Sequence, residues 1–392
     1  MALQPDAAKV KIAITNVHIF DGQRFSDLGT VVIDDGLIGR SADVGGVDVI
    51  DGHGGYLLPG LIDAHVHLES EETLHHLIKY GITTALDMGT WPPSKLDALR
   101  GLIGLTDIRS AGVPATCPGS LHSCILPFPK GSLVSGPEQA ALFVEDRVSE
   151  GVDYIKVVAD VPGPSQATLN ALVAAAHEHR LLAVAHATAY TPFAMAQDAK
   201  ADIVTHVPLD KALDDEAVQR MVVEKRISVP TLTVAEQLTM KSTKLSGMRH
   251  ILSHPTIIPE MINIMKAKRK DHGGKDQYQC ARDSVTAMYR AGVPILSGTD
   301  ANSMPEIHFD IIHGESLHRE LELLVDASLS TVDALRAATI LPAKHFHLDD
   351  RGAIETGKRA DLILLANDPI LDIRATRSIQ RVWCGGIEVT RH

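Results

Sequence analysis

Short, almost continuously apolar runs alternate with longer amphipathic stretches through the middle of the chain. One such stretch, residues 166–179, places apolar residues at the i, i+3, i+4 and i+7 spacing of a helix. Continuous apolar runs are typical of parallel strands that helices cover on both faces. The pattern predicts strands at 61–65, 83–87, 113–117, 154–158, 182–186, 203–206, 227–230 and 294–297.

Strand–helix units of this number and length match the size of a (β/α)8 TIM barrel, which typically occupies about 250 residues. Outside this region the strand-like runs are shorter and turn residues such as Asp35-Gly36 separate them. Further strand-like runs follow at 361–365 and 379–384. We therefore predict an α/β fold, with a catalytic (β/α)8 barrel over 59–352. Residues 1–58 and 353–392 are predicted to build one small accessory β-sandwich domain together.

A long interval separates the seventh and eighth predicted strands. Residues 236–280 are basic and contain Met240, Met248, Met261 and Met265. A helical insertion on the surface and a lid over the mouth of the barrel both fit this composition. Residues 329–346 predict a further helical stretch before the strand-like tail begins.

The composition excludes several classes of protein. Of the 392 residues, 45% are hydrophobic and 22% are charged, which is the balance of a folded globular chain and not of a disordered one. The 37 Lys and Arg residues against 49 Asp and Glu residues give a formal net charge of −12. An acidic chain binds polyanions poorly, so nucleic acid is not an expected partner.

The cysteines and the apolar segments bear on the cellular location. Four cysteines without a Cys-x-x-Cys pair are too few for a disulfide framework. We find neither the apolar core of a signal peptide nor the roughly 18 uninterrupted apolar residues of a membrane span. We therefore expect a cytoplasmic protein with reduced thiols, a small-molecule substrate and no membrane partner.

Residues of the metal-ligand type follow or end several of the predicted strands. His65 and His67 are two residues apart, so their side chains leave an extended strand on the same face. His186 and His206 end the fifth and sixth strands, and Asp300 follows the eighth. Each residue alone has an ordinary structural explanation. Because barrel enzymes place their chemistry at the carboxyl ends of the strands, the joint pattern predicts a metal site with open positions.

Lys156 lies inside the fourth predicted strand, which is otherwise apolar. A buried ammonium is costly unless it is paired or chemically altered, and burial favours the neutral amine. A neutral amine can take up carbon dioxide and become an anionic carbamate, whose two oxygens can bridge two divalent ions. The alternative is a lysine that reaches from the barrel rim to a carboxylate on the surface.

The combination of these motifs resembles the metal-dependent amidohydrolase superfamily. The resemblance rests on the segment Leu58–His67, on Lys156, His186 and His206, on the segment Ser297–Asp300, and on the tail segment Gly352–Leu364. The 230–232 and 318–321 segments are similar to the branch that holds imidazolonepropionase-like and prolidase-like enzymes, including hydrolases of N-acyl amino acids such as ochratoxin. Imidazolonepropionase uses one metal and no carboxylated lysine, so Lys156 favours the two-metal, prolidase-like side. Pro208–Asp214 departs from the glycine-containing sequence expected there.

The resemblance implies a binuclear centre and a hydrolytic mechanism. Two divalent ions, with zinc expected, would share a hydroxide that attacks the carbonyl of an amide. By resemblance, His65, His67 and Asp300 hold one ion, His186 and His206 hold the other, and the carbamate of Lys156 bridges them. Asp300 would also pass the proton from the nucleophile to the leaving nitrogen as a general acid–base.

Two further residues are predicted to contact the substrate. His122, after the third predicted strand, could donate to a substrate carbonyl or carboxylate, and a loop histidine on the surface is the alternative. Tyr190 could line the pocket or simply pack. The expected substrate is an N-acyl amino acid, a dipeptide or a cyclic amide. A lactonase or esterase, a decarboxylase, an organophosphate hydrolase and a non-catalytic scaffold are the alternative functions, and relatives of this kind are commonly homo-oligomers.

Overall fold

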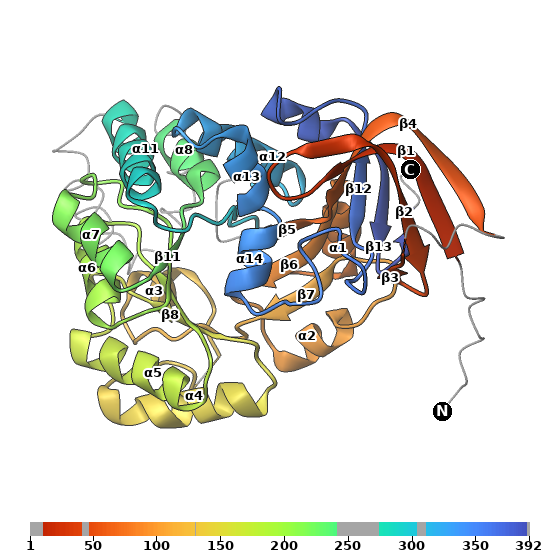
Figure 1. The fold of residues 1–392 in the computed structure, drawn as a ribbon. Helices are drawn as coiled ribbons and strands as arrows, with labels where there is room; N and C mark the ends of the chain where they lie inside the picture. The colour runs from red at the N-terminus through yellow and green to blue at the C-terminus, as the bar shows by residue number, and fades with distance from the viewer. Residues whose placement is uncertain (1–10, 41–46, 130, 241–273, 304–310, 390–392) are drawn as a thin grey trace, which may run out of the picture.

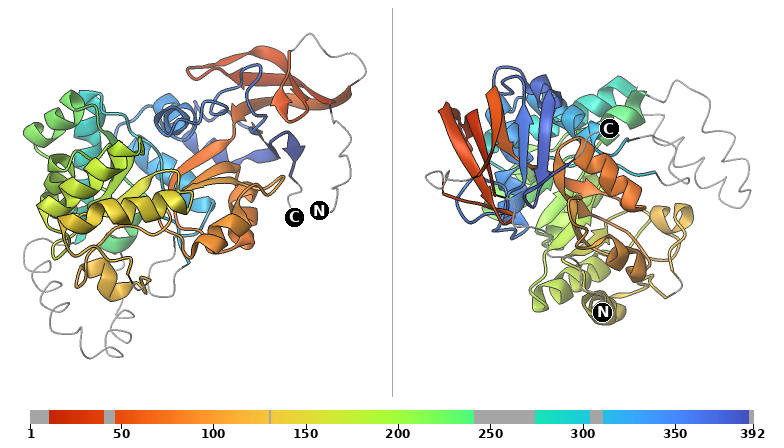
Figure 2. Two further views of the ribbon diagram at one scale, coloured as in Figure 1. Left: turned by 90° about the horizontal axis from the view of Figure 1, so that it is seen from below. Right: turned by 90° about the vertical axis from the view of Figure 1, so that its right-hand side faces the viewer.

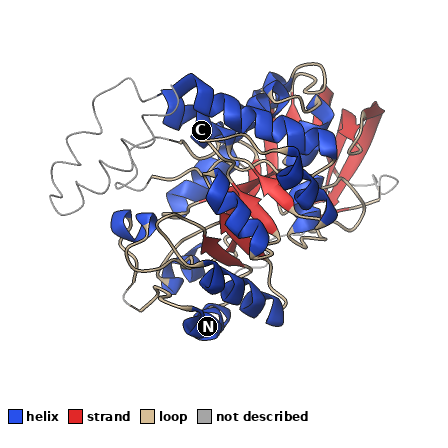
Figure 3. Cartoon of the chain, turned by 90° about the vertical axis from the view of Figure 1, so that its left-hand side faces the viewer, coloured by secondary structure: helices blue, strands red, loops and turns tan. Residues whose placement is uncertain are grey.

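The computed structural model describes residues 11–40, 47–129, 131–240, 274–303 and 311–389, and the following description concerns these residues. They form two parallel sheets and one larger mixed sheet. Helices lie around the strands of the parallel sheets, whereas the mixed sheet lies at one side of the molecule (Figures 1 and 3).

The two parallel sheets carry most of the strands that the sequence predicts. Every residue of β5, β6 and β8 is buried, which explains the continuously apolar sequence of these strands. The first sheet has the order β5-β6-β7 and the second has the order β11-β10-β9-β8. Their bounds are β5 (Leu61–Val66), β6 (Ile82–Asp87), β7 (Asp107–Ser110), β8 (Ile155–Val158), β9 (Ala183–His186), β10 (Ile203–Thr205) and β11 (Ile227–Val229).

Isolated parallel bridges join the two sheets to each other. Ala115 bridges to Val157 of β8, on the side of the first sheet that ends with β7. On the other side, Ile295 bridges to Ser228 of β11, and Ala301 bridges to Val66 of β5. Residues 295–301 therefore connect the outer strand of the second sheet to the first strand of the other sheet.

Two predicted elements differ from the structure. The third strand is β7 at Asp107–Ser110, whereas 113–117 contains only the bridge at Ala115. The alternating strand was overlooked because Arg109, paired with Asp107 at 3.1 Å, breaks the apolar pattern. The predicted eighth strand, 294–297, is likewise reduced to the bridge at Ile295.

The helical stretch predicted at 329–346 is divided into two helices. Helix α13 ends at Ala337 and α14 begins at Ile340. Pro342 explains the division, because it has no N–H to donate and its ring crowds the carbonyl four residues earlier. By contrast, the helix predicted at 166–179 is confirmed as α5, Gln166–Glu178, and its apolar residues are buried.

Most of the other helices follow strands of the parallel sheets along the chain. Helix α3 is a short exception, because it lies in the loop that leads from the third strand to α4. The helices are α1 (Glu71–Lys79), α2 (Pro93–Leu99), α3 (Leu121–Ile125), α4 (Ala140–Ser149), α6 (Tyr190–Asp198), α7 (Asp215–Val223), α8 (Leu232–Met240), α11 (Gly274–Ala291), α12 (Glu315–Asp326), α13 (Thr331–Ala337) and α14 (Ile340–His345).

Both ends of the chain contribute to the mixed sheet, whose strand order is β14-β13-β12-β4-β1-β2-β3. Strand β4 pairs antiparallel with β12, so residues from opposite ends of the sequence lie side by side (Figure 2). Its strands are β1 (Lys11–Phe20), β2 (Phe25–Asp34), β3 (Leu37–Ile38), β4 (Asp48–Pro59), β12 (Leu362–Leu365), β13 (Ile379–Cys384) and β14 (Ile387–Glu388).

The mixed sheet curls around a core of its own. Trp383 is fully buried there with apolar side chains of β1, β2 and β12. The backbone of 358–360 connects the two outer edges of the sheet, because Ile38 N donates to Lys358 O, Ala360 N to Gly36 O, and Gly386 N to Ala360 O.

The interval between the seventh and eighth predicted strands is described only at its two ends, by α8 and α11. The proposed insertion or lid itself lies outside the described residues. Among the helices that are described, none is both long enough and apolar enough to cross a membrane.

Glu320 of α12 is buried and holds the start of α8. Its two carboxylate oxygens accept hydrogen bonds from Leu232 N at 2.8 Å and from Thr233 N at 2.7 Å. Burial raises the pKa of Glu320 to about 8, although these hydrogen bonds lower it. The folded protein therefore keeps a proton on Glu320 over a pH range in which the unfolded chain has lost it.

Replacing Glu320 by Gln should change how stability depends on pH. Because the pKa in the folded state is raised, wild-type stability contributed by the protonated group is lost as the pH rises from about 5 to about 8. Relative to Glu320→Gln, the wild-type free energy of unfolding should fall by up to about 1.4 kcal/mol per pH unit in this window. A difference in the free energy of unfolding that does not depend on pH is also expected, since the single amide oxygen of Gln cannot accept the hydrogen bonds from both Leu232 N and Thr233 N.

Urea denaturation at a series of pH values measures this difference. Glu322→Gln on the same helix is the matched control. Arg319 and Arg377 lower the pKa of Glu322, so this residue is ionised in both the folded and the unfolded protein within this pH window. Parallel stability curves for wild type and Glu320→Gln would show that Glu320 does not bind the extra proton.

Candidate metal centre

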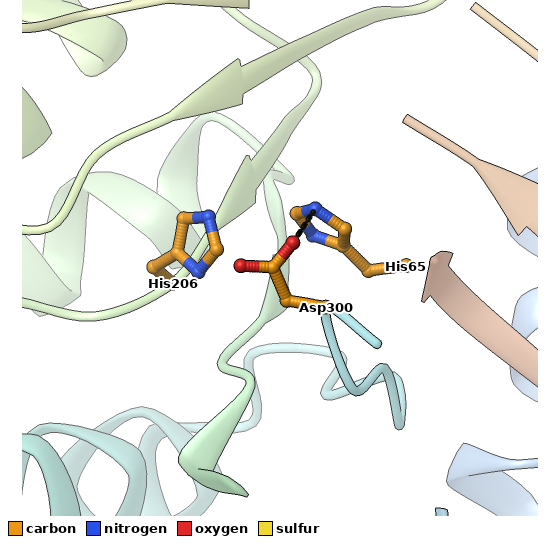
Figure 4. A group of neighbouring side chains, drawn as sticks. All are labelled: His65, His206 and Asp300. Carbon is orange, nitrogen blue, oxygen red and sulfur yellow. Dashed lines mark ion pairs between the residues drawn. The ribbon is translucent and has the colours of Figure 1, made fainter. Parts of the chain in front are cut away.

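The carboxyl ends of the parallel strands bring the predicted ligands together. His65 lies in β5 and His67 directly follows it, His186 ends β9, and His206 follows β10. Figure 4 shows the carboxylate of Asp300 between the rings of His65 and His206. These three residues each offer a ligand atom, and the atoms lie within 4.8 Å of one another.

Asp300 presents one oxygen to two imidazoles. Its Oδ1 lies 3.2 Å from His65 Nε2 and 3.0 Å from His67 Nε2. The spacing predicted from an extended strand is therefore observed, since both rings of the His-x-His pair reach the same atom. His65 is 1% exposed, whereas the side chains of His67 and Asp300 are 17% and 15% exposed, so the contact is buried on the His65 side only.

The second ring nitrogens of His67 and His206 have hydrogen-bond partners, as those of metal-binding histidines usually do. His67 Nδ1 donates to the carbonyl of Gly89 at 3.2 Å, which leaves the lone pair of a neutral ring on Nε2. His206 Nδ1 lies 2.7 Å from the hydroxyl of Thr231. Within the described residues, His65 Nδ1 is buried without a hydrogen-bond partner. Imidazole nitrogens and a carboxylate in this arrangement suit divalent cations as ligands.

Backbone geometry at the site is unusual. His206 and Asp300 have φ values of 67° and 58°, in the left-handed region that residues other than glycine seldom adopt. Such strain persists where the surrounding structure enforces it, and it is common at functional sites. Gly298 allows the close approach, because a Cβ there would lie 2.5 Å from Val229 Cγ1 and 2.9 Å from the backbone nitrogen of His65.

The imidazole rings form a continuous row that leads from the interior toward solvent. The ring centroids of His65 and His206 are 4.9 Å apart, those of His206 and His186 are 4.4 Å apart, and those of His186 and His122 are 4.4 Å apart. The side chain of His186 is 13% exposed and that of His122 is 24% exposed. His122 of α3 therefore lies at the outer end of the row.

Lys156 is buried beside this row. It is 4% exposed, and its Nζ donates to the hydroxyl of Thr205 at 2.7 Å. Burial lowers the pKa of Lys156 to about 7, although Asp300 and Asp87 raise it. The interpretation in which this lysine reaches a carboxylate on the surface is therefore wrong, because its amine points into the protein.

Electrostatics favours an ionised Asp300 and neutral imidazoles at His65, His186 and His206. For His67, burial lowers the pKa but the contact with Asp300 outweighs it, so this pKa is raised. Burial lowers the pKa of His65 to about 3 and holds the pKa values of His186 and His206 well below the usual range. Burial alone would raise the pKa of Asp300, but its contacts with the histidines hold this pKa well below its usual range. A metal ion binds neutral imidazole and carboxylate, so these are the required forms.

Asp160 is a site residue that the sequence prediction missed. It follows β8, and its Oδ2 lies 2.5 Å from His122 Nδ1, while its Oδ1 lies 3.8 Å from His186 Nε2. His122, Asp160 and His186 form a second group whose ligand atoms lie within 4.8 Å of one another. The signal was available in the sequence, because Asp160 comes four residues after Lys156 where the fourth strand ends.

Two other buried carboxylates, Asp63 and Asp87, accept hydrogen bonds from the backbone of the 65–68 segment. Asp63 accepts hydrogen bonds from Thr299 Oγ1 at 2.7 Å and from His65 N at 3.1 Å, and burial raises its pKa to about 7. Asp87 accepts from Thr90 Oγ1 at 2.7 Å. Both residues lie within strands that were read as simply apolar.

Tyr190 and two further histidines, His313 and His318, make hydrogen bonds within the protein. The Tyr190 hydroxyl donates to Asp214 Oδ2 at 2.5 Å, so its contact with substrate stays a prediction. His313 Nε2 donates to the carbonyl of His67 at 2.8 Å, and His318 Nε2 donates to the carbonyl of Tyr80 at 3.0 Å.

The Amidohydrolase family model matches residues 56–389 of this chain. The chain belongs to the Amidohydrolase family. This member is 23% identical over 381 residues to an adenine deaminase from Lactobacillus delbrueckii subsp. bulgaricus, covering 92% of this chain and 57% of that protein. It thus spans little more than half the length of this curated relative.

Solved structures resemble this family member over nearly the whole chain. A Xaa-Pro dipeptidase with bound methionine in its active site has a TM-score of 0.78 at 24% identity, covering 97% of this chain and 99% of that one. The ochratoxinase of A. niger has a TM-score of 0.75 at 19% identity, covering 97% and 95%. The family expected from the motifs is confirmed, and the similar structures include a dipeptidase and an ochratoxinase, as expected for the prolidase-like branch.

Proposed function

We propose that this protein is a binuclear metal-dependent hydrolase that cleaves an amide C–N bond in a small-molecule substrate. One observation carries the proposal: Asp300 and the four histidines, which come from four separate segments of the chain, converge where Lys156 is buried. Burying these polar groups costs free energy of desolvation, and a non-catalytic scaffold would gain nothing that offsets this cost.

The donor set suits two divalent ions, and zinc is the metal we propose. His65, His67 and Asp300 would hold one ion, and His186 and His206 would hold the other. When bound, such ions lower the pKa of water from about 15.7 toward about 7 and polarise a carbonyl.

A carboxylated Lys156 would supply an oxygen to each ion. Its burial supports this assignment, because its amine has Thr205 Oγ1 as a hydrogen-bond partner and no carboxylate at ion-pair distance within the described residues. A buried amine of this kind favours its neutral form, and only that form takes up carbon dioxide.

Asp300 and His122 would handle the proton and the substrate. Asp300 takes the proton from the attacking water and delivers it to the leaving nitrogen, which must be protonated before an amide bond breaks. Figure 4 shows that the second oxygen of Asp300 points toward His206, away from the His65 contact. His122, at the outer end of the row, hydrogen-bonds the substrate, and Tyr190 would border the same pocket.

We also propose how the chain is organised. The two parallel sheets, joined by the bridges at Ala115, Ile295 and Ala301, would be arcs of one closed (β/α)8 barrel. The barrel would span 59–352, with 1–58 and 353–392 as the accessory β-domain. The carboxyl ends of the strands would then form one mouth, as in other barrel enzymes.

Hydrolysis of an amidine C–N bond is a second candidate function, because the curated relatives are adenine deaminases. Coverage favours the amide substrate. The chain spans 57% of the adenine deaminase but 99% of the dipeptidase and 95% of the ochratoxinase. We therefore expect an N-acyl amino acid or a dipeptide in preference to adenine, a lactam or a lactone.

A release assay over a panel of these compounds tests the proposed function. The protein is purified without chelator and its metal content is measured before the assay. Hydrolysis of one or more N-acyl amino acids or dipeptides is the expected result. Release of ammonia from adenine alone would replace the amide proposal with the deaminase, and absence of bound metal would remove the basis of both.

Replacing Asp300 by Asn should separate proton transfer from metal binding. The amide oxygen keeps a ligand atom near His65 and His67 but cannot take a proton, so kcat should fall by about 10²–10⁴-fold while much of the metal stays bound. Steady-state kinetics and elemental analysis measure the two effects. Asp198→Asn, at an exposed ion pair with Arg220, is the control. Undiminished kcat in Asp300→Asn would rule out its acid–base role.

Replacing Lys156 by Ala should release metal. Short carboxylic acids such as acetate should restore part of the metal content and activity, because they can occupy the space of the carbamate. Lys344→Ala removes an exposed lysine of α14 and should leave both unchanged. Full metal content in Lys156→Ala, with no response to added carboxylic acid, would contradict a bridging carbamate.

A further inference from the structure

We propose that Asp160 is a positioning residue that holds His122 at the mouth of the site, so that Nε2 of this ring faces the substrate. The inference rests on the proposed function, because it assumes that His122 contacts a substrate there. It adds a residue that neither the family motifs nor the metal-ligand pattern includes.

The contact between the two side chains is short and buried on one side. His122 Nδ1 lies 2.5 Å from Asp160 Oδ2, and the side chain of Asp160 is only 6% exposed. The second oxygen of Asp160 lies 3.8 Å from His186 Nε2, which is beyond hydrogen-bond distance. The hydrogen bond to His122 is therefore the stronger of its two contacts with imidazoles.

The chemistry of this contact decides which nitrogen is free. An ionised carboxylate only accepts hydrogen bonds, so the hydrogen lies on Nδ1 of His122. Nδ1 is then not available to a metal ion, and Nε2 has no hydrogen-bond partner among the described residues. The same logic orients the imidazole of a Ser-His-Asp triad, in which a buried carboxylate fixes the tautomer of the ring.

The supporting elements explain why His122 needs such an anchor. Helix α3, which carries His122, has five residues and lies within a long loop, so its own hydrogen bonds fix it poorly. Asp160 lies two residues after the end of β8. This buried strand is held on one side by its pairing with β9 and on the other by the bridge between Val157 and Ala115. A second contact, from Leu121 N to Pro162 O at 3.3 Å, attaches α3 to the chain that follows β8.

The position of His122 at the end of the histidine row is why we assign its Nε2 to the substrate. His122 contacts His186, a proposed metal ligand, with perpendicular rings, and it is the most exposed ring of the row at 24%. Of the rings in the row, His122 is therefore the one most accessible to a substrate from solvent. By fixing this ring, Asp160 acts on the substrate through His122 and not by direct contact.

A double-mutant cycle tests the proposal on a substrate that wild type hydrolyses. Partners that orient site histidines are worth about 10–100-fold, so Asp160→Ala should lower kcat/KM by about this factor, with the metal content of wild type. In a His122→Ala background the same substitution should cost less than about twofold, because residues acting through one contact are not additive. Asp160→Asn keeps the size of the side chain, but its amide can donate to Nδ1 as well as accept from it, so this variant should also lower kcat/KM.

Asp51→Ala is the matched control, because Asp51 faces His53 at 3.5 Å in an exposed pair of the mixed sheet. Equal losses from Asp160→Ala in both backgrounds would show a general structural role and overturn the proposal. Metal lost from both Asp160→Ala and Asp160→Asn would overturn it too, since Asp160 would then be a ligand.

The tautomer of His122 gives a readout that does not depend on hydrolysis. In protein labelled with 15N-histidine, the His122 signals are identified by their loss in His122→Gln. They should show a hydrogen on Nδ1 in wild type, and loss of this single tautomer in both Asp160→Ala and Asp160→Asn. An Nδ1 without hydrogen in wild type would contradict the proposal, whereas wild type that hydrolyses nothing on the panel would contradict only the proposed function.

Discussion

The buried contact between Asp63 and Thr299 joins the first and last units of the parallel sheets. Asp63 Oδ2 accepts from Thr299 Oγ1 at 2.7 Å, and Asp63 Oδ1 accepts from Thr299 N at 3.1 Å, across 236 positions of sequence. Because Asp300 is the next residue, this contact determines where its carboxylate lies relative to His65. The remaining ligands can complete a centre only if these two sides are held together.

The site is built from polar groups at a depth where water does not compensate them. His65, Lys156 and His206 are almost completely buried, and burial favours the neutral form of each. A neutral imidazole can bind a cation, and a neutral amine can react with carbon dioxide. The cost of burying them is therefore linked to the chemistry that we propose.

The motifs at strand ends were predictable because their geometry is local. His65 and His67 share a face through the two-residue repeat of a strand, and Gly298 precedes Asp300 where the chain must pass close to β5. The buried strands were recognisable by continuous apolar sequence, except where Asp107 and Arg109 interrupt it in β7. The division between α13 and α14 also had a local cause in Pro342, which the helical pattern alone concealed.

The sequence by itself determined the family and most of the buried strands, and it predicted the ligand residues, because side-chain chemistry and short-range periodicity depend on neighbouring positions. Only the tertiary structure decided which partners those residues have. Asp160 and His122 are 38 positions apart, and Glu320 caps α8 from 87 and 88 positions away. Such contacts depend on how the loops and helices pack in space, and no local pattern encodes that arrangement.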